Sequence, residues 1–119
     1  IGLATGSRTC DVEAALKNLA GGRMAGLFQT IVTADDVENS KPDPASYATA
    51  VKNLGVDPAG CFAIEDSPDG IKSAVGAGLR VIGVAVMHDA SKLSEAERVV
   101  PTLTGVSLDD LKQWFAQPT

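Results

Sequence analysis

The chain has 119 residues, of which 45% are hydrophobic and 4% aromatic, and its formal net charge is −5 with a pI near 4.6. This length allows one domain with a core of Ala, Val, Leu and Ile side chains. The acidic balance without a basic run excludes a nucleic-acid surface, and no apolar run reaches the roughly 20 residues that cross a bilayer.

Apolar and amphipathic segments alternate along the chain. Short apolar runs predict strands near 1–4, 30–33, 61–65, 80–85 and 97–100. Amphipathic runs predict helices near 8–20, 45–54, 68–77 and 108–116, the last with Leu108, Leu111 and Phe115 facing the core. This alternation indicates one α/β domain over residues 1–119, with a parallel sheet covered by helices on both faces.

The first chemical feature follows the first predicted strand. Leu3-Ala4 leads into Thr5-Gly6-Ser7-Arg8 just before a predicted helix. A hydroxyl and free backbone N–H groups at such a position can bind an oxyanion. A simple helix-capping loop would have the same composition, so both interpretations stand for this segment alone.

The second feature is a lysine between prolines, in Ser40-Lys41-Pro42-Asp43-Pro44. Proline restricts the backbone on which the amine is carried, and a held ammonium can stabilise charge that develops on a phosphate or carboxylate. The alternative is an exposed lysine in the loop that enters the next helix.

The third feature is a pair of consecutive carboxylates, Glu65 and Asp66, where an apolar strand passes into a helix. Ligands of parallel α/β sheets bind at the carboxyl ends of the strands, and paired carboxylate oxygens suit Mg²⁺. Ser67 and Pro68 also predict an ordinary capped helix start, which would leave Glu65 without a role.

The three segments, in their order and spacing, resemble motifs two, three and four of the haloacid dehalogenase superfamily of Mg²⁺-dependent phosphotransferases. The resemblance is to its β-phosphoglucomutase and phosphoglycolate-phosphatase-like branch, and it continues through Asp69-Gly70-Ile71 to Val81-Ile82-Gly83-Val84. It implies a Rossmann-like core that acts on a small phosphorylated metabolite.

The resemblance also implies roles for individual residues. The expected phosphate-binding groups are Thr5, Gly6, Ser7 and Lys41, with Thr5 and Lys41 assisting catalysis. The expected Mg²⁺ ligands are Asp66 and, directly or through water, Glu65.

The family's first motif, Asp-x-Asp, does not occur in these residues, and neither Asp35-Asp36 nor Asp109-Asp110 is a suitable substitute. The resemblance therefore implies a catalytic core without its first strand, its nucleophile and its helical cap, which is inactive or incomplete as this chain. The alternative is a non-catalytic binding or assembly module. Because that strand is central in the family, we expect that a second copy or a partner chain covers the exposed sheet edge, or that the chain rearranges its strand order.

The two cysteines, Cys10 and Cys61, lie in separate segments without C-x-x-C spacing. This spacing favours reduced thiols and a cytoplasmic protein.

Overall fold

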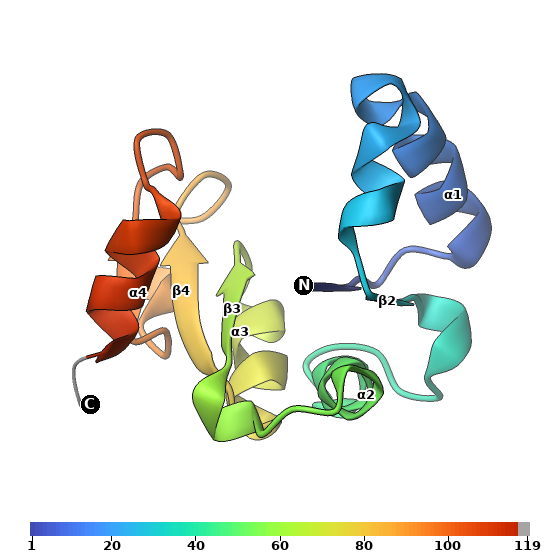
Figure 1. The fold of residues 1–119 in the computed structure, drawn as a ribbon. Coiled ribbons are helices and arrows are strands. Elements are labelled where there is room, and N and C mark those ends of the chain that lie inside the picture. Colours follow the sequence, from blue (N-terminus) through green and yellow to red (C-terminus); the bar gives the residue numbers. More distant parts are fainter. Residues whose placement is uncertain (117–119) are drawn as a thin grey trace.

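The computed structural model describes residues 1–116, which form two parallel sheets and the helices around them (Figure 1). In the smaller sheet, β1 (Gly2–Ala4) pairs with β2 (Thr30–Val32). In the larger sheet, β4 (Arg80–Val84) lies between β3 (Phe62–Glu65) and β5 (Arg98–Val100). All five strands lie where the sequence predicts them, and all pairs are parallel.

The α-helices also lie at the predicted positions. They are α1 (Thr9–Asn18), α2 (Ala45–Leu54), α3 (Pro68–Gly76) and α4 (Leu108–Ala116). A further 3₁₀ segment, η1 (Leu19–Leu27), follows α1 directly and was not expected from the sequence. Shorter 3₁₀ turns are η2 (Ala34–Asp36), η3 (Pro58–Gly60) and η4 (Ala90–Leu93).

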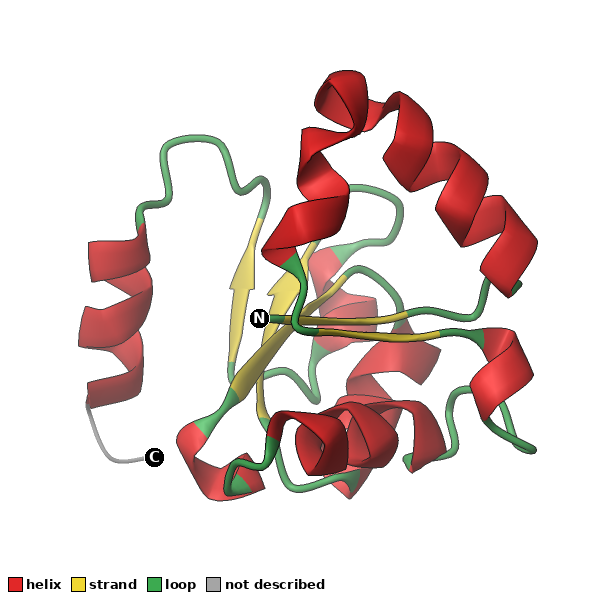
Figure 2. Ribbon diagram, turned by 45° about the vertical axis from the view of Figure 1, so that its right-hand side comes forward, coloured by secondary structure: helices red, strands yellow, loops and turns green. Residues whose placement is uncertain are grey.

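Helices cover both faces of the larger sheet (Figure 2). Ala63 of β3 belongs to a buried cluster that includes Ile71 and Ala74 of α3. Its neighbour Phe62 stacks on Phe115 of α4, with ring centroids 4.6 Å apart. Successive side chains of a strand point to opposite faces, so α3 and α4 lie on opposite sides of β3. The α/β architecture predicted from the sequence is thereby confirmed.

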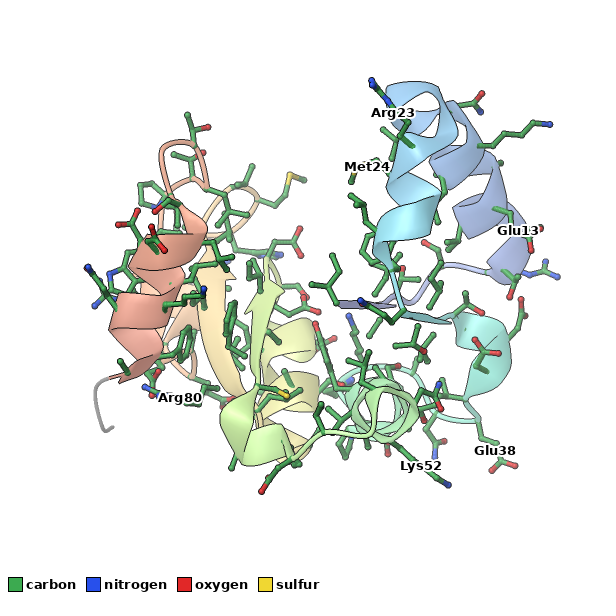
Figure 3. The ribbon with its side chains drawn as sticks, viewed as in Figure 1. Glu13, Arg23, Met24, Glu38, Lys52 and Arg80 are labelled. Carbon is green, nitrogen blue, oxygen red and sulfur yellow. The ribbon has the colours of Figure 1, made fainter. Side chains whose placement is uncertain are left out.

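The packing of α4 differs from the expectation in one respect. Leu108 is 62% exposed, so the prediction that it faces the core is wrong. It is the first residue of the helix and follows a loop, whereas Phe115 near the other end is held by the stack on Phe62. Arg80, labelled beside α4 in Figure 3, lies over the Phe115 ring and donates to the Phe115 carbonyl oxygen.

The strands form two separate sheets, with no ladder joining β1 to β3. The connection between the sheets is α2, which contacts β1, β2 and α3. Both cysteines are free, with Cys10 exposed and Cys61 half-buried. No helix within residues 1–116 is long and apolar enough to cross a membrane.

Candidate phosphate and metal site

The candidate site lies where the carboxyl ends of β1 and β3 approach each other. Lys41 reaches both of them. Its Nζ donates to the carbonyl oxygen of Ala4, the last residue of β1, at 3.1 Å. It also forms an ion pair with Oε1 of Glu65, the last residue of β3, at 2.6 Å. An ammonium group has three N–H donors, so one donor of Lys41 remains for a ligand.

The loop that carries Lys41 is fixed at several points. The Asp43 amide donates to the Ser40 carbonyl oxygen at 3.0 Å, which closes a turn around Lys41 and a cis Pro42. The Asp43 side chain accepts from the Ala45 amide at the start of α2. The fully buried Ser73 of α3 donates to the Asp43 carbonyl oxygen at 2.6 Å. The lysine therefore extends from a loop that is anchored to two helices.

Tyr47 of α2 is a site residue that the sequence analysis missed. Its hydroxyl donates to Glu65 Oε1, the oxygen that also accepts from Lys41, and its ring lies 4.9 Å from Lys41 Nζ. Burial, together with the hydrogen bond to Glu65, raises the pKa of Tyr47 far above its usual value. Tyr47 is the only tyrosine in the chain. A half-buried tyrosine hydroxyl needs a polar partner, and this need is the signal that could have pointed to Tyr47.

The Glu65 carboxylate fills the space that a side chain at position 70 would occupy. A Cβ atom built on Gly70 would lie 1.9 Å from Glu65 Oε2, a distance that no real structure permits. The carboxylate therefore packs against the first turn of α3 at a position open only to glycine. Glu65 is 8% exposed, and its carboxylate contacts Lys41, Tyr47 and the backbone at Gly70.

Asp66 differs from Glu65 because its side chain is exposed. The next residue, Ser67, caps α3 by accepting from the Gly70 amide at 3.1 Å, and Pro68 is the first helical residue, as the sequence predicts. The capped helix start and the accessible carboxylate are therefore both present, in consecutive residues.

These carboxylates fit Mg²⁺ chemically. Magnesium commonly binds one or two protein carboxylates and completes its shell with water and substrate phosphate oxygens. Asp66 can supply such a ligand, and Glu65 lies next to it with Oε1 engaged by Lys41 and Tyr47. Within residues 1–116, no three His, Cys, Asp or Glu side chains gather into a complete protein cage.

The Thr5-Gly6-Ser7 loop continues from the end of β1. The Thr5 amide donates to the Val32 carbonyl oxygen at 2.9 Å, and the Thr5 hydroxyl accepts from the Ser7 amide at 3.1 Å. That hydroxyl keeps its own proton, which is free to donate to an oxyanion. A Cβ on Gly6 would meet nothing within 4 Å, so the space beside this backbone is open to a ligand.

Three aspartates of the other two consecutive pairs, Asp35, Asp36 and Asp110, accept hydrogen bonds from nearby backbone amides. Asp36 forms a capping box with Thr33, and the Thr9 amide donates to Asp35 at 2.8 Å, which lowers the pKa of Asp35. Asp110 accepts from the amide of Ser107.

Four of the predicted site residues line one cavity of about 860 Å³ between the sheets: Thr5, Lys41, Glu65 and Asp66. Gly6 and Ser7 lie in the exposed loop that continues from Thr5. The three segments singled out in the sequence therefore converge at one edge of the fold.

The sequence profile of the haloacid dehalogenase-like hydrolases matches residues 1–84. The chain belongs to this family. One relative, validoxylamine A 7'-phosphate phosphatase from Streptomyces hygroscopicus subsp. limoneus, is 38% identical over 106 residues, which are 89% of this chain and 48% of the relative.

Solved structures of the haloacid dehalogenase-like family share the fold. CbbY from Rhodobacter sphaeroides, in complex with xylulose-(1,5)bisphosphate, superposes with a TM-score of 0.82 at 31% identity, covering 92% of this chain and 50% of CbbY. A putative β-phosphoglucomutase from Thermotoga maritima gives a TM-score of 0.80 at 31% identity, covering 94% and 51%. The chain thus spans about half the length of these relatives.

Proposed function

We propose that the chain supplies the phosphate-binding and Mg²⁺-binding half of a phosphatase or phosphomutase that acts on a small phosphorylated metabolite. The observation that carries this proposal is that Lys41, which keeps one N–H donor, and the exposed Asp66 line the same cavity. A validoxylamine phosphate phosphatase and a CbbY bound to a sugar bisphosphate among the relatives support the substrate class.

The phosphoryl group is bound by groups from two loops. Lys41 offers its remaining N–H donor, and the Thr5 hydroxyl offers its proton. The Gly6 backbone can approach an oxyanion closely because no side chain fills that space, and Ser7 follows it in the same exposed loop. Donors fixed in advance stabilise the negative charge of a transferring phosphoryl group without reorganising during the reaction.

Asp66 holds Mg²⁺ in this proposal, with Glu65 beside it as a direct or water-mediated ligand. A bound Mg²⁺ neutralises charge on phosphoryl oxygens and orients the phosphate. The ion pair between Glu65 and Lys41 fixes the distance between the cation-binding and phosphate-binding halves of the site.

The chain alone is proposed to turn over little or no phosphate ester. Thr5 and Lys41 carry no carboxylate, and Asp66 is assigned to Mg²⁺ in this proposal. Removing the nucleophile from residues that act as a unit typically costs many orders of magnitude in rate. The free thiols of Cys10 and Cys61 favour a reducing compartment such as the cytoplasm.

Calorimetric titration with inorganic phosphate, with and without Mg²⁺, tests the proposal. We expect phosphate binding that Mg²⁺ strengthens, that Lys41→Ala weakens at least tenfold, and that loses its Mg²⁺ dependence in Asp66→Asn. Lys92→Ala and Asp89→Asn, which change exposed residues of the same types, are the matched controls. Phosphate affinity that is the same in all five proteins would contradict the proposed site.

Hydrolysis of an aryl phosphate tests the proposed inactivity separately. We expect the unmodified chain to be as slow as Asp66→Asn. Turnover that requires both Lys41 and Asp66 would show that this chain is a complete enzyme.

A further inference from the structure

Tyr47 makes polar contacts with the candidate site in addition to its packing contacts. Its side chain packs against the hydrophobic cluster that includes Ile71 of α3. Its hydroxyl reaches beyond that cluster and donates to Glu65 Oε1. Lys41 Nζ lies over the ring, 4.9 Å from its centroid, which is within the range of a cation–π contact. One side chain of α2 therefore contacts both members of the ion pair between Lys41 and Glu65.

The Glu65 carboxylate is a fixed member of this group. It is 8% exposed, and its Oε2 lies against Gly70 in the first turn of α3. That helix packs against α2, which carries Tyr47 (Figure 1). The Tyr47 ring is rigid and has two side-chain torsions, both restricted by the hydrophobic cluster. Neither Glu65 nor Tyr47 can therefore move far unless a helix moves with it.

Lys41 is the member of the group that can move. Its ammonium is carried on a flexible four-carbon chain, and its side chain is 17% exposed. Two of its three N–H donors bond to the Ala4 carbonyl oxygen and to Glu65 Oε1. The three donors of an ammonium keep fixed angles to one another, so a turn of the third donor toward a phosphate lengthens the contact with Glu65.

A buried carboxylate that loses its cation without replacement is strongly disfavoured. The Tyr47 hydroxyl supplies the replacement, because it donates to the same oxygen that Lys41 contacts. This donor keeps its proton at neutral pH, because burial and the hydrogen bond to Glu65 raise the pKa of Tyr47 far above its usual value. The phenol is neutral, so it bonds to Glu65 and leaves the negative charge that keeps Lys41 protonated.

We propose that Tyr47 is a positioning residue for Lys41: its hydroxyl keeps Glu65 Oε1 hydrogen-bonded while Lys41 turns its third N–H donor toward a bound phosphate. The ring closes one side of the space around the ammonium, so it also restricts the direction of that turn. Without the hydroxyl, Oε1 would retain Lys41 more strongly and phosphate would bind more weakly. This inference rests on the proposed binding of phosphate by Lys41.

A double-mutant cycle of phosphate binding tests the proposal. Calorimetric titration with inorganic phosphate, in the presence of Mg²⁺, gives the dissociation constants of the unmodified chain, Tyr47→Phe, Lys41→Ala and the double variant. We expect Tyr47→Phe to weaken phosphate binding about fivefold when Lys41 is present, and to have no further effect on Lys41→Ala. A role confined to packing would give the same effect of Tyr47→Phe in both backgrounds.

The control for a general loss of stability is Val81→Ala, which shortens a buried side chain of β4 in the core of the larger sheet. It should bind phosphate as the unmodified chain does. A binding loss in Val81→Ala equal to that in Tyr47→Phe would contradict a specific role for Tyr47.

A second readout needs no substitution at Tyr47. This residue is the only tyrosine, so a carbon-13 label on the ring carbon that bears the hydroxyl gives one NMR signal, which reports the hydrogen bond. We expect the signal to shift during phosphate titration with the midpoint found by calorimetry, and to stay unchanged in Lys41→Ala at the same phosphate concentrations. An unchanged signal in the unmodified chain at saturating phosphate would overturn the proposal.

The outcomes separate this inference from the proposed function. If Lys41→Ala binds phosphate as well as the unmodified chain does, the proposed function fails, and the role of Tyr47 fails with it. If Lys41→Ala weakens binding and Tyr47→Phe does not, the proposed function stands and Tyr47 is not a positioning residue. Equal effects of Tyr47→Phe in the two backgrounds lead to the same conclusion.

Discussion

The Tyr47 hydroxyl and the Lys41 ammonium donate to one and the same oxygen atom, Glu65 Oε1. A hydrogen bond to a charged acceptor contributes about 1.5–3 kcal/mol. Tyr47→Phe should therefore lower the free energy of unfolding by about 2 kcal/mol, measured by urea denaturation. Ser94→Ala, which removes an exposed hydroxyl, should change it by less than about 0.5 kcal/mol. Equal effects of the two substitutions would show that the Tyr47 contact contributes little.

The raised pKa of Tyr47 also predicts how the stability of the chain depends on pH. Its pKa is raised in the folded chain above the usual 10.0, so the unfolded chain loses the phenolic proton first. The stability linked to Tyr47 is complete below pH 10 and falls as the pH rises above that value. Phenolate absorbance reports this residue alone, because it is the only tyrosine.

We expect the phenolate signal to rise together with unfolding instead of before it. The alkaline loss of stability should be smaller in Tyr47→Phe, which has no phenolic proton to lose. Ionisation of Tyr47 near pH 10 in the folded chain would contradict the buried contact.

The ion pair between Lys41 and Glu65 should show strong coupling. Lys41→Met leaves a carboxylate that is 8% exposed without its cation, which should cost about 3 kcal/mol of unfolding free energy. The double variant Lys41→Met with Glu65→Gln should recover at least about 1 kcal/mol of that loss, because the uncompensated charge is gone. Simple additivity of the two substitutions, measured in the same denaturant series, would argue that the pair is not coupled.

Gly70 is expected to be intolerant of any side chain. Gly70→Ala places a methyl group against Glu65 Oε2, so either α3 or the carboxylate must move, at a cost of about 1–3 kcal/mol. Gly60→Ala is the matched control, because a Cβ there meets nothing within 4 Å. Thermal unfolding of the two variants distinguishes crowding at Glu65 from a general effect of replacing glycine.

The fold, and the meeting of the three singled-out segments at one cavity, could be predicted from the sequence to a large extent. The apolar runs locate every strand, and Ser67 with Pro68 defines the start of α3. The convergence of Thr5, Lys41 and Glu65 follows from the rule that parallel strands present ligands at their carboxyl ends. Their roles with phosphate and metal stay predictions.

Other features could not be predicted, for physical reasons. Periodicity shows which face of α2 is buried, but it does not show that the Tyr47 hydroxyl meets Glu65. Glycine is required at position 70 because the Glu65 side chain, five residues earlier, packs against it, and this direction cannot be read from the spacing of the residues. Leu108 has the spacing of a core residue, yet its place at the start of α4 leaves it exposed.

The separation of the sheets has a consequence for how cooperatively the chain unfolds. The unit of β1, β2 and α1 is joined to the larger sheet mainly through α2 and the two bonds of Lys41. Units that share few contacts open independently, at a lower free energy than the whole domain. The smaller sheet should therefore melt before the larger one, and thermal unfolding should show two transitions instead of one.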